Sequence, residues 1–233
     1  MPPADPSLRR HDWVWPTPDW ADRLLAPVAP PARPALAAWI AAGRPLVVGR
    51  RQAEDDPASV RLGFAMPDKT RWGVHLDSAA ILRPGAPPSL DEIRASVPET
   101  WSPALGHLAE SLAEAGIVAG VFGSFAWQYR AQGTRAYVTA TSDIDLLFTV
   151  PDGAGLDRLF RILERHHAHF PVLRIDGEIW LPDGGAVAWR ELAAHSDEGR
   201  PQVRQDKILV KSLDRLDLLC RDTVLSQFRR SAA

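Results

Sequence analysis

A short run dense in proline and glycine, Arg83-Pro84-Gly85-Ala86-Pro87-Pro88, interrupts this chain of 233 residues. Proline lacks a backbone donor and glycine lacks a side chain, so such a density of both disfavours any regular element. We therefore expect a boundary here, with one domain at residues 1–88 and a second at residues 89–233. The length of the chain is sufficient for two modest domains, each with a core.

Charge and hydropathy exclude several classes of partner. The formal net charge is -2, which gives no overall attraction to nucleic acid or to a membrane surface. The start, Met1–Pro6, lacks the basic segment and apolar run of a signal peptide, and no later apolar stretch is long enough to span a bilayer. We expect a cytoplasmic protein that binds neither nucleic acid nor membrane. The single cysteine, Cys220, lies in an apolar run and is expected to be buried.

The two halves differ in their patterns. Residues 45–50 and 72–76 are short strand-like runs in a half rich in proline and tryptophan, which predicts a small, mostly β module. Trp13 and Trp15 are expected to pack that module. The second half alternates between helical and extended patterns, so the fold class expected is α+β.

Individual elements of the second half follow from caps and periodicity. Ser89 caps a helix start. Helical patterns cover 104–115, 125–130 and 156–167, strand patterns cover 116–122, 142–150, 172–181 and 186–189, and the tail from Ile208 to Phe228 is expected to be helical.

Two acids on one of these strands provide the first chemical signal. Side chains of a strand alternate between its faces, so Asp143 and Asp145 point the same way. Oxygen ligands of this kind suit Mg²⁺, which keeps waters and substrate phosphates in its other positions. An exposed strand face can also carry such a pair without binding a metal, so the pair needs support from a second motif.

That support comes from Gly123-Ser124, which ends the preceding strand where a helix begins. Glycine lets the backbone approach a ligand, and the first turn of a helix offers free amides and a positive dipole end. An ordinary turn with a serine cap has the same residues. Together with the acids, however, the turn places a phosphate site beside a metal site, which is what phosphoryl transfer requires.

These motifs resemble those of the polymerase-β-type nucleotidyltransferase superfamily. Within it, residues 121–128 with 142–147 are similar to the malonate decarboxylase holo-acyl-carrier-protein synthases. Other similar segments extend the resemblance over most of the chain, namely residues 10–15, 45–48, 50–52, 176–178 and 182–184. The resemblance implies a nucleotidyltransferase domain with a short mixed sheet flanked by helices.

The resemblance also implies a reaction. A phosphoribosyl-dephospho-CoA group would move from triphosphoribosyl-dephospho-CoA to a serine of the apo acyl-carrier subunit of malonate decarboxylase, and pyrophosphate would be released. Asp143 and Asp145 would hold Mg²⁺, for which Mn²⁺ could substitute. Gly123 and Ser124 would bind the phosphates.

The superfamily usually has a third carboxylate on a neighbouring strand. The candidates are Asp176, which we prefer, and Glu178; the residue would act as a general base or as a further metal ligand. Arg51 and Lys211 are our first choices as ligands of the triphosphate. The other basic candidates are Arg50, Lys69, Arg71 and Lys207.

Two other functions fit the same residues. The chain could be a nucleotidyltransferase that uses a nucleoside triphosphate to modify a small molecule, or an inactive module that binds a carrier protein. His166, His167 and His169 lie at a predicted helix end without acidic or cysteine partners at metal-site spacing. They are therefore expected to interact with the helix dipole instead of zinc.

Overall fold

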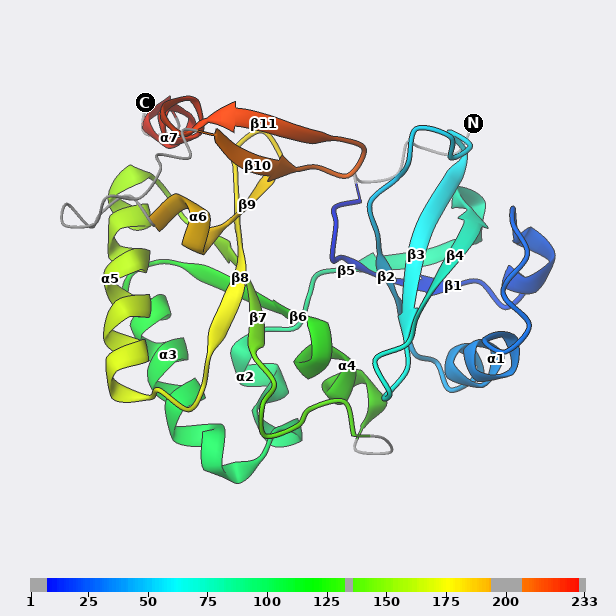
Figure 1. Cartoon of the computed structure of the whole chain (residues 1–233). Coiled ribbons are helices and arrows are strands. Elements are labelled where there is room, and N and C mark those ends of the chain that lie inside the picture. Colours follow the sequence, from blue (N-terminus) through cyan, green and yellow to red (C-terminus); the bar gives the residue numbers. More distant parts are fainter. Residues whose placement is uncertain (1–7, 133–135, 194–206, 231–233) are drawn as a thin grey trace. The chain divides into compact units, whose positions relative to one another are not determined.

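The computed structural model describes residues 8–132, 136–193 and 207–230 (Figure 1). The chain forms two compact units, with the division after Pro87. Two short segments of the second half, Arg130–Tyr137 and Ser212–Arg215, belong to the first unit by their contacts. The units contain two separate sheets and a set of helices, so the fold class is α+β.

The first unit contains an antiparallel sheet with the strand order β4-β3-β2-β1-β5. Its strands are β1 (Trp13–Pro16), β2 (Leu46–Val48), β3 (Ser59–Ala65), β4 (Arg71–Asp77) and β5 (Ile81–Gly85). Helix α1 (Arg33–Ala41) and the short 3-10 helices Trp20–Arg23 and Ser78–Ala80 complete the unit. Strands β2 and β4 confirm two of the sequence predictions, and the unit is mostly β as expected.

The proline-rich run begins inside a strand, contrary to our expectation that it would exclude regular structure. Arg83, Pro84 and Gly85 belong to β5, where Pro84 is paired with Val14 of β1. Proline has no backbone N–H group. It can occupy an edge strand because one side of such a strand has no neighbouring strand that requires a hydrogen bond. Strand β5 is such an edge strand.

The core of the first unit lies between α1 and the long hairpin of β3 and β4. Leu36 and Trp39 of α1 are buried, as is Phe64 of β3. The rings of Trp39 and Phe64 have centroids 5.7 Å apart, and the Trp39 indole donates to the carbonyl of Pro45. Burial of such aromatic side chains contributes a few kcal/mol each, on the order of 25 cal/mol per Å². Trp13 is also buried, as predicted.

The second unit contains a mixed sheet with the order β11-β10-β9-β8-β7-β6. Only the pair β7 and β8 is parallel among its described strands. The strands are β6 (Val118–Phe122), β7 (Ile144–Thr149), β8 (Ile175–Trp180), β9 (Ala186–Ala188), β10 (Lys207–Lys211) and β11 (Leu216–Cys220).

Helices α3 (Ser102–Glu114) and α5 (Gly153–His169) lie along one side of this sheet (Figure 1). The unit also contains α2 (Leu90–Ile93), α4 (Gly123–Ala131), α6 (Trp189–Ala193) and α7 (Arg221–Arg230), with 3-10 helices at Arg94–Ser96 and Glu99–Trp101. The predicted helices 104–115, 125–130 and 156–167 are confirmed as α3, α4 and α5. Ser89 forms a full capping box with Glu92 at the start of α2.

The two faces of β7 differ in their surroundings. Ile144, Leu146 and Phe148, at alternate positions of the strand, are fully buried. On the alternate face, Asp145 and Thr149 keep access to solvent, whereas Leu147 between them is buried. One face of β7 is therefore fully buried, and the other is accessible at its polar residues.

The tail is not the single helix that the sequence predicts. It forms the hairpin of β10 and β11, followed by α7. Ile208 and Val210 are buried on one face of β10, and the turn at Ser212–Arg215 connects the strands, with Ser212 donating to the carbonyl of Arg215. The alternation of apolar side chains and the pairing with β9 outweigh local helical propensity.

Cys220 is the last residue of β11 and is exposed, so the prediction of a buried thiol is wrong. Its strand lies at the edge of the sheet, where Leu218 is also exposed. Among the described helices, none combines the length and the apolar character required to cross a bilayer.

Candidate active site

Gly123 and Asp145 lie in direct contact in the second unit. The residue at the start of α4, Gly123, has φ = 65°, a left-handed conformation that glycine adopts without strain. A Cβ atom placed on Gly123 would overlap Oδ2 of Asp145 and lie 2.9 Å from its Cγ. The pairing of β6 with β7, in which Phe122 is opposite Asp145, produces this approach. The structure thus brings the turn and the acidic strand together.

Asp145 and Asp176 are neighbours across the parallel strands β7 and β8, where they are register partners. Paired residues of adjacent strands project to the same face of the sheet. Asp176 is exposed, and its Oδ1 accepts a hydrogen bond from the amide of Gly177 at 2.8 Å. Gly177 has φ = 146°, and a Cβ there would overlap the carbonyl oxygen of Leu146. Glycine is therefore required for this pairing.

Asp143 precedes β7 and forms an ion pair with Arg174, which precedes β8. The Nη2 atom of Arg174 also donates to the carbonyl of Thr141 at 3.1 Å. The carbonyl of Arg174 accepts from the amide of Ile144, so backbone pairing positions both members of the ion pair. Both side chains are partly exposed, at 59% for Arg174 and 39% for Asp143, and water therefore screens the pair.

Glu178 and Lys211 form a second ion pair on the same strand face as Asp176. The Nζ atom of Lys211 lies 3.0 Å from Oε1 of Glu178. The Glu178 side chain is only 8% exposed, whereas that of Lys211 is 31% exposed. A buried carboxylate requires a nearby cation, so Lys211 compensates for the charge of Glu178. This arrangement leaves Asp176 as the more accessible of the two candidate third carboxylates.

The remaining predicted ligands lie in different units. Ser124 is half-buried in the first turn of α4, beside Gly123. Arg51 belongs to the first unit, in the loop after β2. Its Nη2 donates to the carbonyl of Asp56 at 3.0 Å, and its amide donates to the carbonyl of Leu213. The guanidinium is thus oriented by its own loop.

The acids present a hard-oxygen donor set of the kind that Mg²⁺ prefers. Among the described residues, no group of three His, Cys, Asp or Glu side chains already has a geometry that could hold a metal ion. Mg²⁺ sites in phosphoryl-transfer enzymes commonly use one or two protein carboxylates and complete the shell with phosphates and water. Asp143 and Asp145 are compatible with that kind of site.

The histidines of α5 differ from the prediction that all three interact with the helix dipole. His166 is fully buried, and within the described ranges neither ring nitrogen has a hydrogen-bond partner. Burial, together with smaller contributions from the nearby His107, His167 and His169, lowers the pKa of His166 to about 4. His169 contacts a carbonyl group at the end of its own helix, with its Nδ1 atom 2.7 Å from the carbonyl oxygen of Arg165.

Sequence reasoning missed two residues of the site, Arg174 and Gly177. Arg174 interacts with Asp143 only because β7 and β8 are parallel neighbours. Gly177 lies between the two candidate third carboxylates in the sequence, and its isolated position inside a strand pattern is a known sign of close backbone approach. The sequence therefore contains a signal for Gly177, but it contains none for the contact of Arg174 with Asp143.

Two family models together match nearly the whole chain. The N-terminal domain of phosphoribosyl-dephospho-CoA transferase MdcG matches residues 9–87, and the C-terminal domain of the same transferase matches residues 89–222. No solved structure matches the chain. The two matched regions meet within the proline-rich run.

Curated relatives carry one name, phosphoribosyl-dephospho-CoA transferase. The protein from Xanthomonas campestris pv. campestris (strain 8004) is 35% identical over 221 residues, which cover 94% of this chain and 97% of the relative. The protein from Xanthomonas euvesicatoria pv. vesicatoria is 37% identical over 84% of this chain and 91% of the relative. The protein from Bradyrhizobium diazoefficiens is 32% identical over 93% and 92%, respectively.

The matches cover both halves of the chain, and the relatives align over almost their full lengths. The same alignment spans the Gly-Ser turn and the acidic strand that the structure brings into contact. The chain belongs to the phosphoribosyl-dephospho-CoA transferase family and is a transferase enzyme.

Proposed function

We propose that this enzyme transfers the phosphoribosyl-dephospho-CoA group from triphosphoribosyl-dephospho-CoA to a serine of the apo acyl-carrier subunit of malonate decarboxylase. The name shared by the relatives supports the transferred group. The observation that carries the proposal is the contact of Gly123 with Asp145. It joins a helix start suited to phosphates with a carboxylate suited to a divalent cation.

The proposed step is an in-line displacement at phosphorus. The Oγ atom of the carrier serine forms a bond to the α-phosphorus, and the bond from that phosphorus to the bridging oxygen of the leaving group breaks. Pyrophosphate takes the electron pair of this bond, and the serine proton passes to a base. Asp176 is the proposed base because it is exposed and paired in register with Asp145.

Backbone and basic groups orient the phosphates in this proposal. The amides at the start of α4, around Gly123 and Ser124, donate to the outgoing phosphate oxygens. Lys211 adds a point charge whose position is fixed by Glu178. Arg51 is the proposed phosphate ligand of the first unit. Before a cation binds, the guanidinium of Arg174 partly compensates the negative charge of the Asp143 carboxylate.

Asp143 and Asp145 would hold Mg²⁺, with Mn²⁺ as a substitute. The cation supplies neutralisation of charge on the attacking and leaving oxygens, which is a large part of catalysis in phosphoryl transfer. The carboxylates would orient the cation next to the Gly123 turn. The proposal places Asp145 and Asp176 side by side on β7 and β8, where a carrier serine could approach.

Intact mass measurement of the carrier tests this function. The apo carrier subunit is incubated with the enzyme, Mg²⁺ and triphosphoribosyl-dephospho-CoA, and we expect a mass gain equal to the phosphoribosyl-dephospho-CoA group. A carrier with its acceptor serine replaced by alanine is expected to gain nothing. Transfer of a nucleotide from ATP to a small molecule, without modification of the carrier, would instead support the alternative nucleotidyltransferase function.

A further inference from the structure

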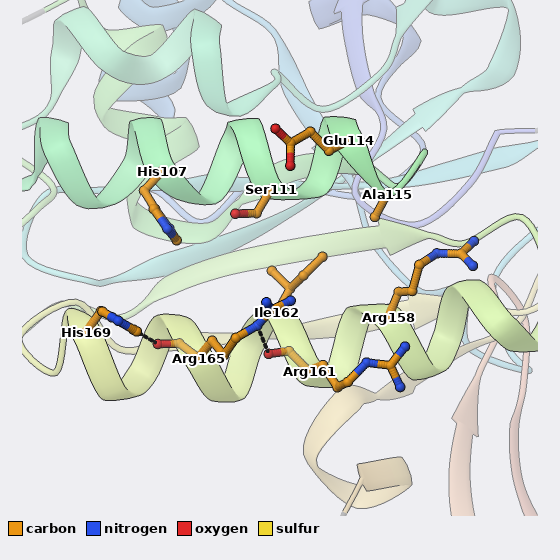
Figure 2. Close-up of a pocket in the computed structure, with 9 residues that line it drawn as sticks. All are labelled: His107, Ser111, Glu114, Ala115, Arg158, Arg161, Ile162, Arg165 and His169. Carbon is orange, nitrogen blue, oxygen red and sulfur yellow. Dashed lines mark hydrogen bonds between the residues drawn. The ribbon is translucent and has the colours of Figure 1, made fainter.

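A groove of about 440 Å³ lies between the antiparallel helices α3 and α5 of the second unit. Figure 2 shows His107 directed from α3 towards α5, and three arginines on the α5 side. These arginines are Arg158, Arg161 and Arg165. Their spacing of three and four residues places them along one side of the helix. The groove is thus lined by a row of cations.

The charge of this row is poorly compensated within the unit. Arg158 forms a long ion pair with Asp152, in which Nη2 of the arginine lies 3.9 Å from Oδ1 of the carboxylate. The Nε atom of Arg165 donates to the carbonyl of Arg161, and in the described parts of the chain no carboxylate forms a salt bridge with either of these two arginines. Like charges one turn apart on a helix repel one another, so an anion that binds between them removes an unfavourable interaction.

Imidazoles close one end of the groove. The rings of His107 and His169 have centroids 6.4 Å apart, and the centroid of the buried His166 ring lies 6.2 Å from that of His107. Glu114 is the one acid that lines the described groove. Figure 2 shows its carboxylate lying over the α3 ribbon. The cationic side chains therefore outnumber the acid, and they line a common space.

We propose that the groove between α3 and α5 is a binding site for an anion with several linked phosphates, such as tripolyphosphate, and that this binding needs no divalent metal. A single phosphate can contact only one or two guanidinium groups. Arg158 and Arg165 are seven residues apart, or about 10 Å along the helix axis. A chain of phosphates can contact several of these arginines through bidentate hydrogen bonds.

This site is separate from the proposed catalytic site. Residues Leu156, Leu159 and Leu163 of α5 are buried in the helical layer that covers one face of the sheet (Figure 1). Asp145 and Asp176 are register partners on β7 and β8 and keep access to solvent, and neither acid lines the groove. The groove and the proposed catalytic carboxylates are therefore distinct sites. The inference does not depend on the identity of the transferred group.

Calorimetric titration with tripolyphosphate tests the inference. The experiment uses the full chain with EDTA, at an ionic strength of about 0.15 M so that weak surface attraction is screened. We expect saturable binding, and we expect the double variant Arg161→Gln, Arg165→Gln to bind at least about tenfold more weakly, a loss equivalent to 1.4 kcal/mol. Titration with ATP in parallel shows whether a free or a nucleotide-linked phosphate chain is preferred.

Two controls make the result specific. The double variant Arg33→Gln, Arg229→Gln removes the same charge from exposed positions outside the groove and is expected to bind normally. Both arginine variants are compared by circular dichroism, and NMR of the imidazole protons is expected to show shifts at His107 and His169 on binding. Equal affinity in both double variants, absence of binding in the wild type, or loss of binding only in Lys211→Ala would overturn the inference.

Discussion

Gly123 is the residue on which the geometry of the site depends most directly. Two separate constraints require glycine there, its positive φ and the space taken by the Asp145 carboxylate. Gly116 is a useful comparison because its φ of 68° is nearly the same, yet a Cβ there would meet nothing within 4 Å. Substitution of the two glycines therefore distinguishes the effect of backbone strain from the effect of a collision with Asp145.

Gly123→Ala is expected to reduce the transfer rate by at least about a hundredfold, since displacement of a catalytic group by even 1 Å has effects of this size. Gly116→Ala should lower stability by about 1 kcal/mol through backbone strain alone and leave the rate unchanged. Rates of carrier modification and chemical denaturation of both variants check this prediction. A normal rate in Gly123→Ala would show that the contact has no catalytic importance.

Arg174 modulates the charge of Asp143, and its removal should change metal affinity. Because a cation beside a carboxylate opposes the binding of a second cation, Arg174→Gln is expected to bind Mg²⁺ or Mn²⁺ a few-fold more tightly. The partial exposure of the pair limits the effect. Titration of Mn²⁺ followed by electron paramagnetic resonance measures it, with Arg229→Gln as a control. Weaker binding in Arg174→Gln would mean that the arginine orients Asp143 for the metal.

Several elements could be predicted from local sequence, and others could not. Helix α5 has strong periodicity and an Asp152 cap that accepts from Gly155, and β7 is a short apolar run in which all residues except Asp145 and Thr149 are buried. The hairpin of β10 and β11 was missed because its apolar residues also fit a helical pattern. Strand β10 of this hairpin also pairs with β9, and sequence-distant pairing of this kind leaves little local signal.

The burial of His166 makes the packing of α3 against α5 sensitive to acid. Because the pKa of His166 is lowered to about 4 in the folded protein, the unfolded chain binds a proton first as the pH falls. Stability is therefore expected to be fully present above about pH 6.5 and to decrease between pH 6.5 and 4, by up to about 3 kcal/mol. His107, His167 and His169 are the neighbouring groups whose charge opposes that of His166.

Denaturation with urea at several pH values checks this dependence. His166→Phe is expected to lose much less stability than the wild type between pH 6.5 and 4, since a neutral ring cannot be protonated. His169→Gln is the matched control, because it removes an exposed imidazole from the same helix and should keep the dependence. If both variants behaved like the wild type, His166 would not be the group responsible.

The loop that carries Arg51 is organised by the carboxylate of Asp55. Its Oδ2 accepts from the amide of Gln52 at 2.8 Å and lies 3.6 Å from Nη1 of Arg61, while Oδ1 lies 3.6 Å from Nδ1 of His75. The Asp55 side chain is only 5% exposed, so these contacts are well protected from solvent. Asp55 therefore acts on the loop as a positioning residue.

Asp55→Asn is expected to raise KM for the triphosphoribosyl substrate about tenfold and to leave kcat nearly unchanged, if Arg51 binds substrate phosphates without entering the chemical step. The comparison is Asp56→Ala, because Asp56 is exposed and its backbone carbonyl, the group that contacts Arg51, is retained. Steady-state kinetics of carrier modification measure both. A change confined to kcat would contradict the positioning role.

At the scale of the whole molecule, the family models and the contact units divide the chain near the same prolines. The segments Arg130–Tyr137 and Ser212–Arg215 have their contacts in the first unit although their neighbours in sequence belong to the second. No local pattern predicts this assignment, because it depends on contacts between residues far apart in the sequence. The motifs of the site, by contrast, are contiguous in sequence and could be identified without the fold.

The central claim is that the turn at Gly123-Ser124 and the acids Asp143 and Asp145 form one metal-dependent phosphate site. The most direct measurement is the anomalous scattering of crystals grown with Mn²⁺ and pyrophosphate. We predict an Mn²⁺ peak within about 2.0–2.3 Å of carboxylate oxygens from both acids, with pyrophosphate at the start of α4. A metal peak away from both acids, or pyrophosphate bound far from Gly123, would contradict the account.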